Sequence, residues 1–325
     1  MKELVLVSCS GGMDSSLTLW AVKTAGYKNV IACHFNYGHR GSKAEELAIT
    51  NVCYNLAIPL KIFNLSHIYK EIKPNSMLTD NKAKITTGTF EGLKQLDAWV
   101  PGRNMMFLTV MATFAESEVM KHDYDKVYLM GGFLNLTESG SYPDNSEYFL
   151  MSALELFKYG TLIGNRIEPL LGLSNLMKSD QYEIIKQFEL YYFYKHTISC
   201  DRPTIDYPRD DYGVLKANVP QVLIPKNCMN QHGIPACGSG LLSYYAGKMV
   251  GIDDTVYRNF YTVQDDTVLH EPEILKHGQV KKDITQIINR IKFPQNKLDK
   301  IHKLLDLKKE RRQVEDDMKW KILRN

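Results

Sequence analysis

Short apolar runs alternate with segments of helical periodicity over most of the chain, and this alternation constrains the fold more than any other feature. Residues 4–7 are apolar at every position, which is typical of a parallel strand covered on both faces. The expected strands are 4–7, 30–35, 60–63 and 127–130, and the expected helices are 14–25, 43–56, 104–120, 146–159, 179–190 and 241–250. Strands separated by helices of this length predict an α/β fold with a doubly wound parallel sheet and right-handed crossovers.

Two stretches lack this alternation. Residues 66–100 are polar and irregular, which is typical of a lid, a binding loop or a disordered segment. Residues 200–240 are rich in proline, asparagine and glycine, and we expect mostly loop there. Further on, apolar side chains follow helical spacing in 284–291 and 298–305, which predicts two helices separated at Pro294.

Composition excludes several classes of protein. The 325 residues suggest two domains, or one large domain with appendages. With 44% hydrophobic and 24% charged residues, the chain is neither wholly disordered nor fibrous. No apolar run approaches the roughly 18 residues that a membrane span needs. The apolar stretch at residues 4–7 is also too short for the core of a signal peptide. We therefore expect a cytoplasmic protein without a membrane partner.

A serine- and glycine-rich loop follows the first expected strand and opens the first expected helix. It reads Ser-Gly-Gly-Met-Asp-Ser-Ser at residues 10–16. Two adjacent glycines let backbone N–H groups turn inward, and the helix N-terminus adds positive potential, so the loop suits a phosphate group. Asp14 repels a bare phosphate and is expected to hold Mg²⁺ or to orient the loop. The alternative is a serine–glycine turn that binds nothing.

This loop resembles the Ser-Gly-Gly-x-Asp-Ser signature of the PP-loop ATP pyrophosphatases, whose members cleave ATP between the α- and β-phosphates. The resemblance implies an adenine nucleotide α-hydrolase-like Rossmann fold, with ATP and Mg²⁺ as cofactors. The nucleotide-binding residues that it implies are Ser8, Ser10, Gly11, Gly12, Met13, Asp14, Ser15, Ser16, Arg103 and Gly131.

Further segments resemble one family within this superfamily, the 7-cyano-7-deazaguanine synthases. Phe-Asn-Tyr-Gly-His-Arg at 35–40 is similar to its Phe-Asp-Tyr-Gly-Gln-Arg, and Val-Pro-Gly-Arg-Asn at 100–104 matches its motif. Tyr-Pro-Asp at 142–144, Pro-Leu at 169–170 with the lysine at 178, and Thr-Ile-Ser-Cys at 197–200 also resemble it. Order and spacing agree from residue 1 to about 250, and several matches in order are far more specific than any one.

The resemblance implies a reaction and a set of site residues. The family activates 7-carboxy-7-deazaguanine as an acyl-adenylate with release of pyrophosphate, ammonia then gives the amide, and a second ATP dehydrates the amide to the nitrile. The implied catalytic residues are Asp14, Ser15, Arg103 and Lys178, and the implied substrate-binding residues are Tyr37, Arg40, Asn104, Tyr142 and Asp144.

Each of these assignments has a simpler alternative. Arg103 always carries charge and suits a carboxylate or phosphate, but it also fits a surface arginine beside a turn. Asn104 lies where a helix N-cap belongs. Lys178 is placed to neutralise α-phosphate charge, or is a solvated lysine at a helix start. Tyr142 and Asp144 fit either a purine-like ring or a plain turn.

The cysteines divide into two groups. Cys9, Cys33 and Cys53 are spread through the N-terminal part and are expected to be buried apolar side chains. Cys200 and Cys237 match the first two ligands of the family's zinc site, but Gly240 and Ser243 stand at the other two positions. One hypothesis is a zinc site made of Cys200, Cys228, His232 and Cys237. The alternative is that the metal has been lost, with Cys237 in the core and His232 exposed.

The chain also departs from the family near the substrate and in its last part. Asn-Ser at 145–146 replaces the family's Cys-Arg, which removes a cation and puts nitrile formation in question. Residues 281–325 carry 14 Lys and Arg against 7 Asp and Glu, while the rest of the chain carries 26 against 30. This basic tail is expected to dock a protein partner, to form a homodimer interface or to pack on the body, with nucleic acid contact the least favoured.

Three functions therefore remain open. The favoured one is a ligase that adenylates the deazaguanine carboxylate for attack by a nitrogen nucleophile, giving the amide or the nitrile. The second is a diverged ligase that joins the deazaguanine to a protein amine, which would make the chain a protein-modifying enzyme of the kind that serves in antiviral defence. The third is a pseudoenzyme that binds nucleotide. The expected units are an ATP-binding domain at 1–195, a cysteine-bearing subdomain at 196–250 and a helical extension at 251–325.

Overall fold

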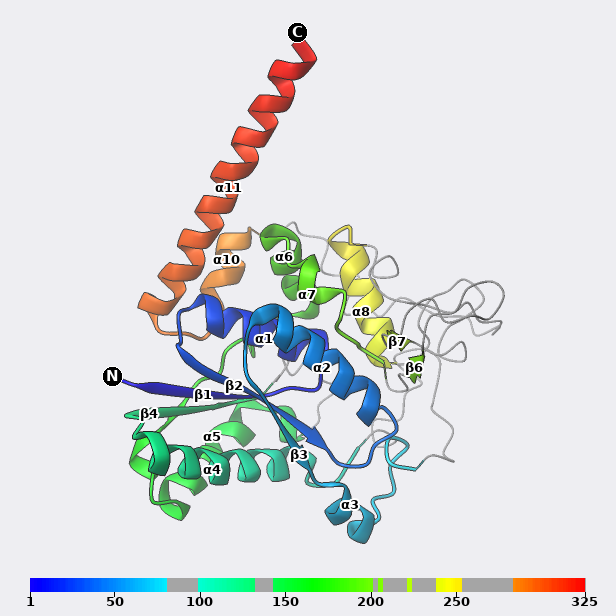
Figure 1. Cartoon of the computed structure of the whole chain (residues 1–325), viewed down its shortest axis with the longest axis vertical. Helices are drawn as coiled ribbons and strands as arrows, with labels where there is room; N and C mark the ends of the chain where they lie inside the picture. Colours follow the sequence, from blue (N-terminus) through cyan, green and yellow to red (C-terminus); the bar gives the residue numbers. More distant parts are fainter. Residues whose placement is uncertain are drawn as a thin grey trace.

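The computed structural model describes residues 1–80, 99–131, 143–200, 204–206, 221–223, 238–252 and 283–324. Five parallel strands form its main sheet in the order β3-β2-β1-β4-β5 (Figure 1). They are β1 (Glu3–Ser8), β2 (Asn29–Asn36), β3 (Leu60–Asn64), β4 (Lys126–Met130) and β5 (Ile167–Pro169). The strand order reverses at β1 and β4, the switch point where ligands bind in open parallel sheets. The predicted doubly wound α/β fold is confirmed.

Helices cover both faces of this sheet. On one side lie α1 (Met13–Thr24) and α2 (Ser42–Leu56), and on the other lie α4 (Arg103–His122) and α5 (Glu147–Gly160) (Figure 1). The remaining described elements are α3 (Ser66–Ile72), α6 (Lys178–Phe188), α7 (Tyr191–Tyr194), α8 (Gly238–Met249), α10 (Ile284–Asn289), α11 (Gln295–Arg324), the 3-10 helices η2 (Pro143–Asn145) and η3 (Gly164–Arg166), and an antiparallel pair β6 (Thr204–Asp206) and β7 (Gln221–Leu223).

The central strand, β1, shows how its apolar sequence matches a sheet that is covered on both faces. Val5 and Val7 of β1 point into one apolar cluster, and Leu4 and Leu6 point into the other. All four side chains have no exposed surface. Because successive side chains of a strand point to opposite faces, a strand buried on both faces needs an unbroken apolar run.

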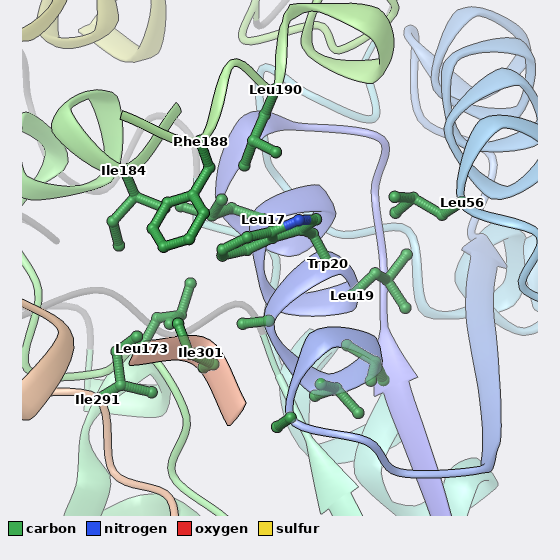
Figure 2. Close-up of a cluster of buried hydrophobic side chains, with 14 of the residues drawn as sticks. Leu17, Leu19, Trp20, Leu56, Leu173, Ile184, Phe188, Leu190, Ile291 and Ile301 are labelled. Atoms are coloured by element: carbon green, nitrogen blue, oxygen red, sulfur yellow. The ribbon is translucent and has the colours of Figure 1, made fainter. Parts of the chain in front are cut away.

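The C-terminal helices α10 and α11 pack on the body rather than apart from it. Figure 2 shows Ile291 and Ile301 in the same apolar cluster as Trp20 of α1 and Phe188 of α6. The Trp20 and Phe188 rings are 4.8 Å apart between centroids. Among the three alternatives for the basic tail, packing on the body is what the described residues show. Figure 1 shows that the last part of α11 extends away from the sheet.

Two sequence predictions about local structure are corrected. Residues 66–72, expected within a long loop, form α3, and β5 was not predicted. β5 has only three residues and contains a proline, so its sequence carries no strand signal. Cys9, Cys33 and Cys53 are buried, as predicted. Within the described ranges, no helix combines the length and the apolar character needed to cross a membrane.

Gly11 tests the packing of the phosphate loop against α2. Its φ is +82°, and a Cβ there would lie 2.9 Å from the Cβ of Ala48 and 2.9 Å from the Glu45 carbonyl oxygen. We expect Gly11→Ala to lower the free energy of unfolding by about 2–4 kcal/mol, because it adds left-handed strain and an overpacked contact. Urea unfolding followed by circular dichroism measures this.

Gly160→Ala is the matched control, since a Cβ at Gly160 would have no atom within 4 Å. It should change the free energy of unfolding by less than about 1 kcal/mol. Equal effects of the two substitutions would contradict the close approach of α2 to the loop.

Candidate active site

The phosphate loop lies between the end of β1 and the start of α1. Gly11 adopts positive φ, and Gly12 precedes the first turn of α1 without a side-chain cap. The hydroxyls of Ser15 and Ser16 donate to the Gly12 carbonyl at 3.2 and 2.7 Å. These two serines therefore stabilise the first turn, whereas Ser10 is exposed and its Oγ accepts from the Gly12 N–H at 3.3 Å. The N–H groups that begin a helix are the usual donors to an anion.

Neighbouring segments fix this loop on two sides. The Cys9 N–H donates to the Cys33 carbonyl at 2.8 Å, and His34 Nδ1 lies 2.9 Å from the Cys9 carbonyl oxygen. On the other side, the Ile198 N–H donates to the Gly11 carbonyl at 3.0 Å. Burial lowers the pKa of His34, which favours the neutral ring at this position.

Asp14 and Lys178 form an ion pair at the mouth of the loop. Lys178 Nζ lies 2.5 Å from Asp14 Oδ2, and the side chains are 4% and 22% exposed. The alternative of a solvated lysine is therefore wrong. The second carboxylate oxygen, Oδ1, is buried and has no hydrogen-bond partner among the described residues. Such an oxygen is the ligand that Mg²⁺ prefers, so Asp14 fits the role of a magnesium ligand.

A second group of predicted residues gathers around Tyr37, just beyond the end of β2. The Tyr37 ring is buried and stacks on His39, with 4.1 Å between centroids. The Arg103 guanidinium lies beside the Tyr37 hydroxyl. Burial raises the pKa of Tyr37 to about 12, and the nearby Arg103 only partly offsets it. The hydroxyl therefore stays protonated at neutral pH.

Asn104 and Asp144 complete this group. Asn104 Nδ2 donates to the Asp144 carbonyl at 3.0 Å, and Arg103 Nε donates to Asn104 Oδ1 at 3.3 Å. The N-cap of α4 is Gly102, so the alternative of Asn104 as a helix cap is wrong. Asp144 is buried, and this burial raises the pKa of its carboxyl although Arg103 lowers it in part.

Glu45 connects the two groups, and its role was not predicted. Its carboxylate lies 3.0 Å from His39 Nε2, beside Tyr37, while its backbone carbonyl lies against Gly11. Burial alone would raise the pKa of Glu45, but His39, His34 and Arg103 together lower it. No local pattern in the sequence indicates this role, because it depends on how α2 approaches Gly11 and His39.

The remaining predicted residues have other contacts or lie outside the described residues. Arg40 Nη2 donates to the Asp80 carbonyl at 2.6 Å, so it holds the segment after α3. Gly131 directly follows β4, beside the end of β1. Tyr142 and three predicted zinc ligands, Cys228, His232 and Cys237, lie outside the described residues, whereas Cys200 is buried. No group of three His, Cys, Asp or Glu suited to a metal occurs in the part of the chain that the structure describes, so the zinc site stays a prediction without support.

Comparison with known proteins decides the family. The family model described as queuosine biosynthesis protein QueC matches residues 4–209. The chain belongs to the QueC family. The predicted resemblance is therefore confirmed, and α8, α10 and α11 lie beyond the matched part.

Proteins named 7-cyano-7-deazaguanine synthase are among its relatives. That of Campylobacter concisus is 33% identical over 202 residues, which is 62% of this chain and 85% of the relative. That of Campylobacter hominis is 32% identical over 213 residues, covering 65% and 87%. That of Saccharolobus solfataricus is 33% identical over 187 residues, covering 57% of this chain but only 38% of the relative. The match thus spans less than half the length of this archaeal relative.

The Asp14–Lys178 pair generates a stability prediction. Lys178→Met should lower the free energy of unfolding by about 2–4 kcal/mol, because it leaves a half-buried carboxylate without its cation. The double variant Asp14→Asn with Lys178→Met should be more stable than Lys178→Met alone. Urea unfolding of these two variants and of Asp14→Asn alone measures the coupling.

The exposed pair Lys158–Glu155 supplies the control. Its atoms lie 3.0 Å apart, and the two side chains are 42% and 54% exposed, so Lys158→Met should cost less than about 1 kcal/mol. A Lys178 variant no less stable than this control would refute the buried pair.

Proposed function

We propose that the chain is an ATP-dependent ligase that adenylates the carboxylate of 7-carboxy-7-deazaguanine for attack by a nitrogen nucleophile. One observation carries the proposal, namely that α2 contacts both groups of residues described above. Its Glu45 and Ala48 lie against the phosphate loop at Gly11, and the Glu45 carboxylate pairs with His39 beside Tyr37. Because α2 holds a phosphate site and a ring-binding site next to each other, the arrangement suits a reaction between a nucleotide and a heterocyclic acid.

The first step joins the two substrates. A carboxylate oxygen attacks the α-phosphorus of ATP, the bond from this phosphorus to the oxygen bridging to the β-phosphorus breaks, and pyrophosphate leaves. Ser10 and the N–H groups at the start of α1 would hold the departing pyrophosphate. Lys178 would neutralise charge that develops on the α-phosphate, and Asp14 holds its ammonium in place. Mg²⁺, held by Asp14 Oδ1, would supply further charge neutralisation at the phosphates.

The residues around Tyr37 suit the deazaguanine acid. Arg103 presents a planar guanidinium that matches a carboxylate, and contacts with Tyr37 and Asn104 fix its orientation. Aromatic rings at Tyr37 and His39 offer surface for a flat base, and the Asp144 carboxyl offers an acceptor for ring N–H groups. Together they would hold the acid with its carboxylate toward the phosphate loop.

The second step forms the carbon–nitrogen bond. The nitrogen lone pair attacks the acyl carbon, AMP leaves, and the nitrogen loses a proton. In place of the family's Cys-Arg stands Asn145-Ser146, and Ser146 Oγ caps α5 by accepting from the Phe149 N–H at 3.0 Å. Because this position supplies a helix cap and no cation, we propose that the reaction ends at the amide. A protein amine in place of ammonia is the second candidate, and it requires only the same two steps.

Mass spectrometry of the reaction tests the proposal directly. Protein, ATP, Mg²⁺, 7-carboxy-7-deazaguanine and ammonium should yield AMP, pyrophosphate and the amide. The nitrile would show that the altered position is tolerated, and a deazaguanine mass on an added protein would favour the second candidate. If no AMP forms with any nucleophile, the ligase proposal fails and a nucleotide-binding pseudoenzyme becomes the better account.

Ser10→Ala tests the role of the phosphate loop separately from that of the acid-binding residues. Ser10 is exposed, so the variant should keep the wild-type free energy of unfolding. It removes a donor to developing negative charge, and we expect pyrophosphate release to fall about 100-fold. Ser152→Ala, at an exposed position on α5, should leave the rate unchanged. A Ser10→Ala enzyme with the full rate would contradict the assignment.

Arg103→Lys isolates the acid-binding group. The lysine keeps the charge but loses the planar fork, so KM for the acid should rise about tenfold or more while KM for ATP changes little. Arg166→Lys alters an arginine whose partner, Asp123, is 89% exposed, and it should leave both constants unchanged. Steady-state kinetics with each substrate varied separately decides between these outcomes.

A further inference from the structure

The extension beyond the family match contacts the segment that carries Lys178. Arg290 lies at the end of α10, and its Nη1 is 2.7 Å from Asp180 Oδ2. Its Nη2 donates to the Asn175 carbonyl. These two contacts lie three residues before and two residues after Lys178. A single guanidinium therefore binds the chain on both sides of the lysine that pairs with the phosphate loop.

Asp180 connects Arg290 to the backbone at the start of α6. Its side chain has no exposed surface, and the same Oδ2 that meets Arg290 accepts from the Met177 N–H at 2.9 Å. Met177 is the N-cap residue of α6, and Lys178 is the first residue of the helix. The carboxylate thus fixes the first helical turn, and the arginine fixes the carboxylate.

We propose that Arg290 is a positioning residue for Lys178, so that the C-terminal extension completes the active site of this chain. The proposal rests on the proposed function, because it concerns the lysine assigned there to the α-phosphate. Asp14, Lys178, Asp180 and Arg290 form a series of alternating charges that runs from the phosphate loop to α10. Residues 4–209 match the family and Arg290 lies outside that range, so the match alone does not account for this last charge.

Arg290 matters to Lys178 because a buried ion pair tolerates little change in the distance between its two charges. Lys178 is 4% exposed, and its ammonium reaches Asp14 from the start of α6. When Arg290 is lost, the buried Asp180 carboxylate loses this cation and the first turn of α6 is less constrained. A shift of about 1 Å at a group that contacts the reacting phosphate is enough to cost a large factor in rate.

Arg290→Met tests the proposal, with Lys308→Met as the matched control. Lys308 also joins the extension to the α6 region, 2.6 Å from Glu189, but at the far end of that helix from Lys178. Arg290→Met should lower kcat for AMP formation roughly tenfold, since the lysine acts in the transition state. Arg290→Lys should recover part of this loss. Lys308→Met should keep the wild-type kcat.

A second readout does not depend on turnover. Reductive methylation of lysines, followed by peptide mass spectrometry, reports how exposed the Lys178 amine is. Its rate of labelling should rise roughly fivefold in Arg290→Met and stay unchanged in Lys308→Met, because only the first variant loosens the start of α6. If Arg290→Met does not fold, Asp180→Asn with Arg290→Met removes both partners and should give the same rise in labelling.

The outcomes separate the two proposals. Wild-type protein that forms no AMP defeats the proposed function, whereas the labelling result still reports on Arg290. Wild-type protein that is active, together with Arg290→Met that matches Lys308→Met in both kcat and Lys178 labelling, overturns the positioning role.

Discussion

The ion pair between Asp14 and Lys178 is the contact on which the site depends. It joins residues 164 positions apart and ties the start of α1 to the start of α6. Removing two charges from water costs free energy, and this cost is offset only when the two charges lie close together. The pair is therefore favourable only if α1 and α6 begin at fixed positions relative to each other. The surrounding apolar cluster, with Trp20 against Phe188, sets the distance between these helices. Packing and electrostatics therefore specify the same geometry.

α2 performs the corresponding task on the other side of the phosphate loop. Its backbone lies so close to Gly11 that only a glycine fits there. The side chain of Glu45, on the same helix, forms an ion pair with His39. Since His39 and Arg103 lower the pKa of Glu45, and Glu45 in turn favours the charged Arg103, this helix organises charge as well as shape. Any movement of α2 would therefore act on the phosphate loop and on the Tyr37 group together.

Sequence reasoning predicted the parts of the fold that follow from local pattern. The apolar run at 4–7 predicted a buried strand in a parallel sheet, and the glycines at 11–12 predicted a loop between this strand and the first helix, and both are confirmed. Phosphate binding by this loop stays a prediction. The role of Glu45 was missed because it depends on how α2 approaches the loop, which is a tertiary contact. The contact of Arg40 with the Asp80 carbonyl was also missed, because it depends on the path of the segment after α3. The Arg290 contact joins residues 110 positions apart, and no local pattern encodes it.

The shared cluster in Figure 2 has a consequence for which part of this chain folds as one unit. Ile291 and Ile301 share an apolar cluster with side chains of α1 and α6, yet they lie outside the part matched by the family. A fragment that ended with the family match would leave the apolar surface of α1 and α6 that they cover exposed to water. The matched part and the part that shares one core are therefore not the same piece of chain.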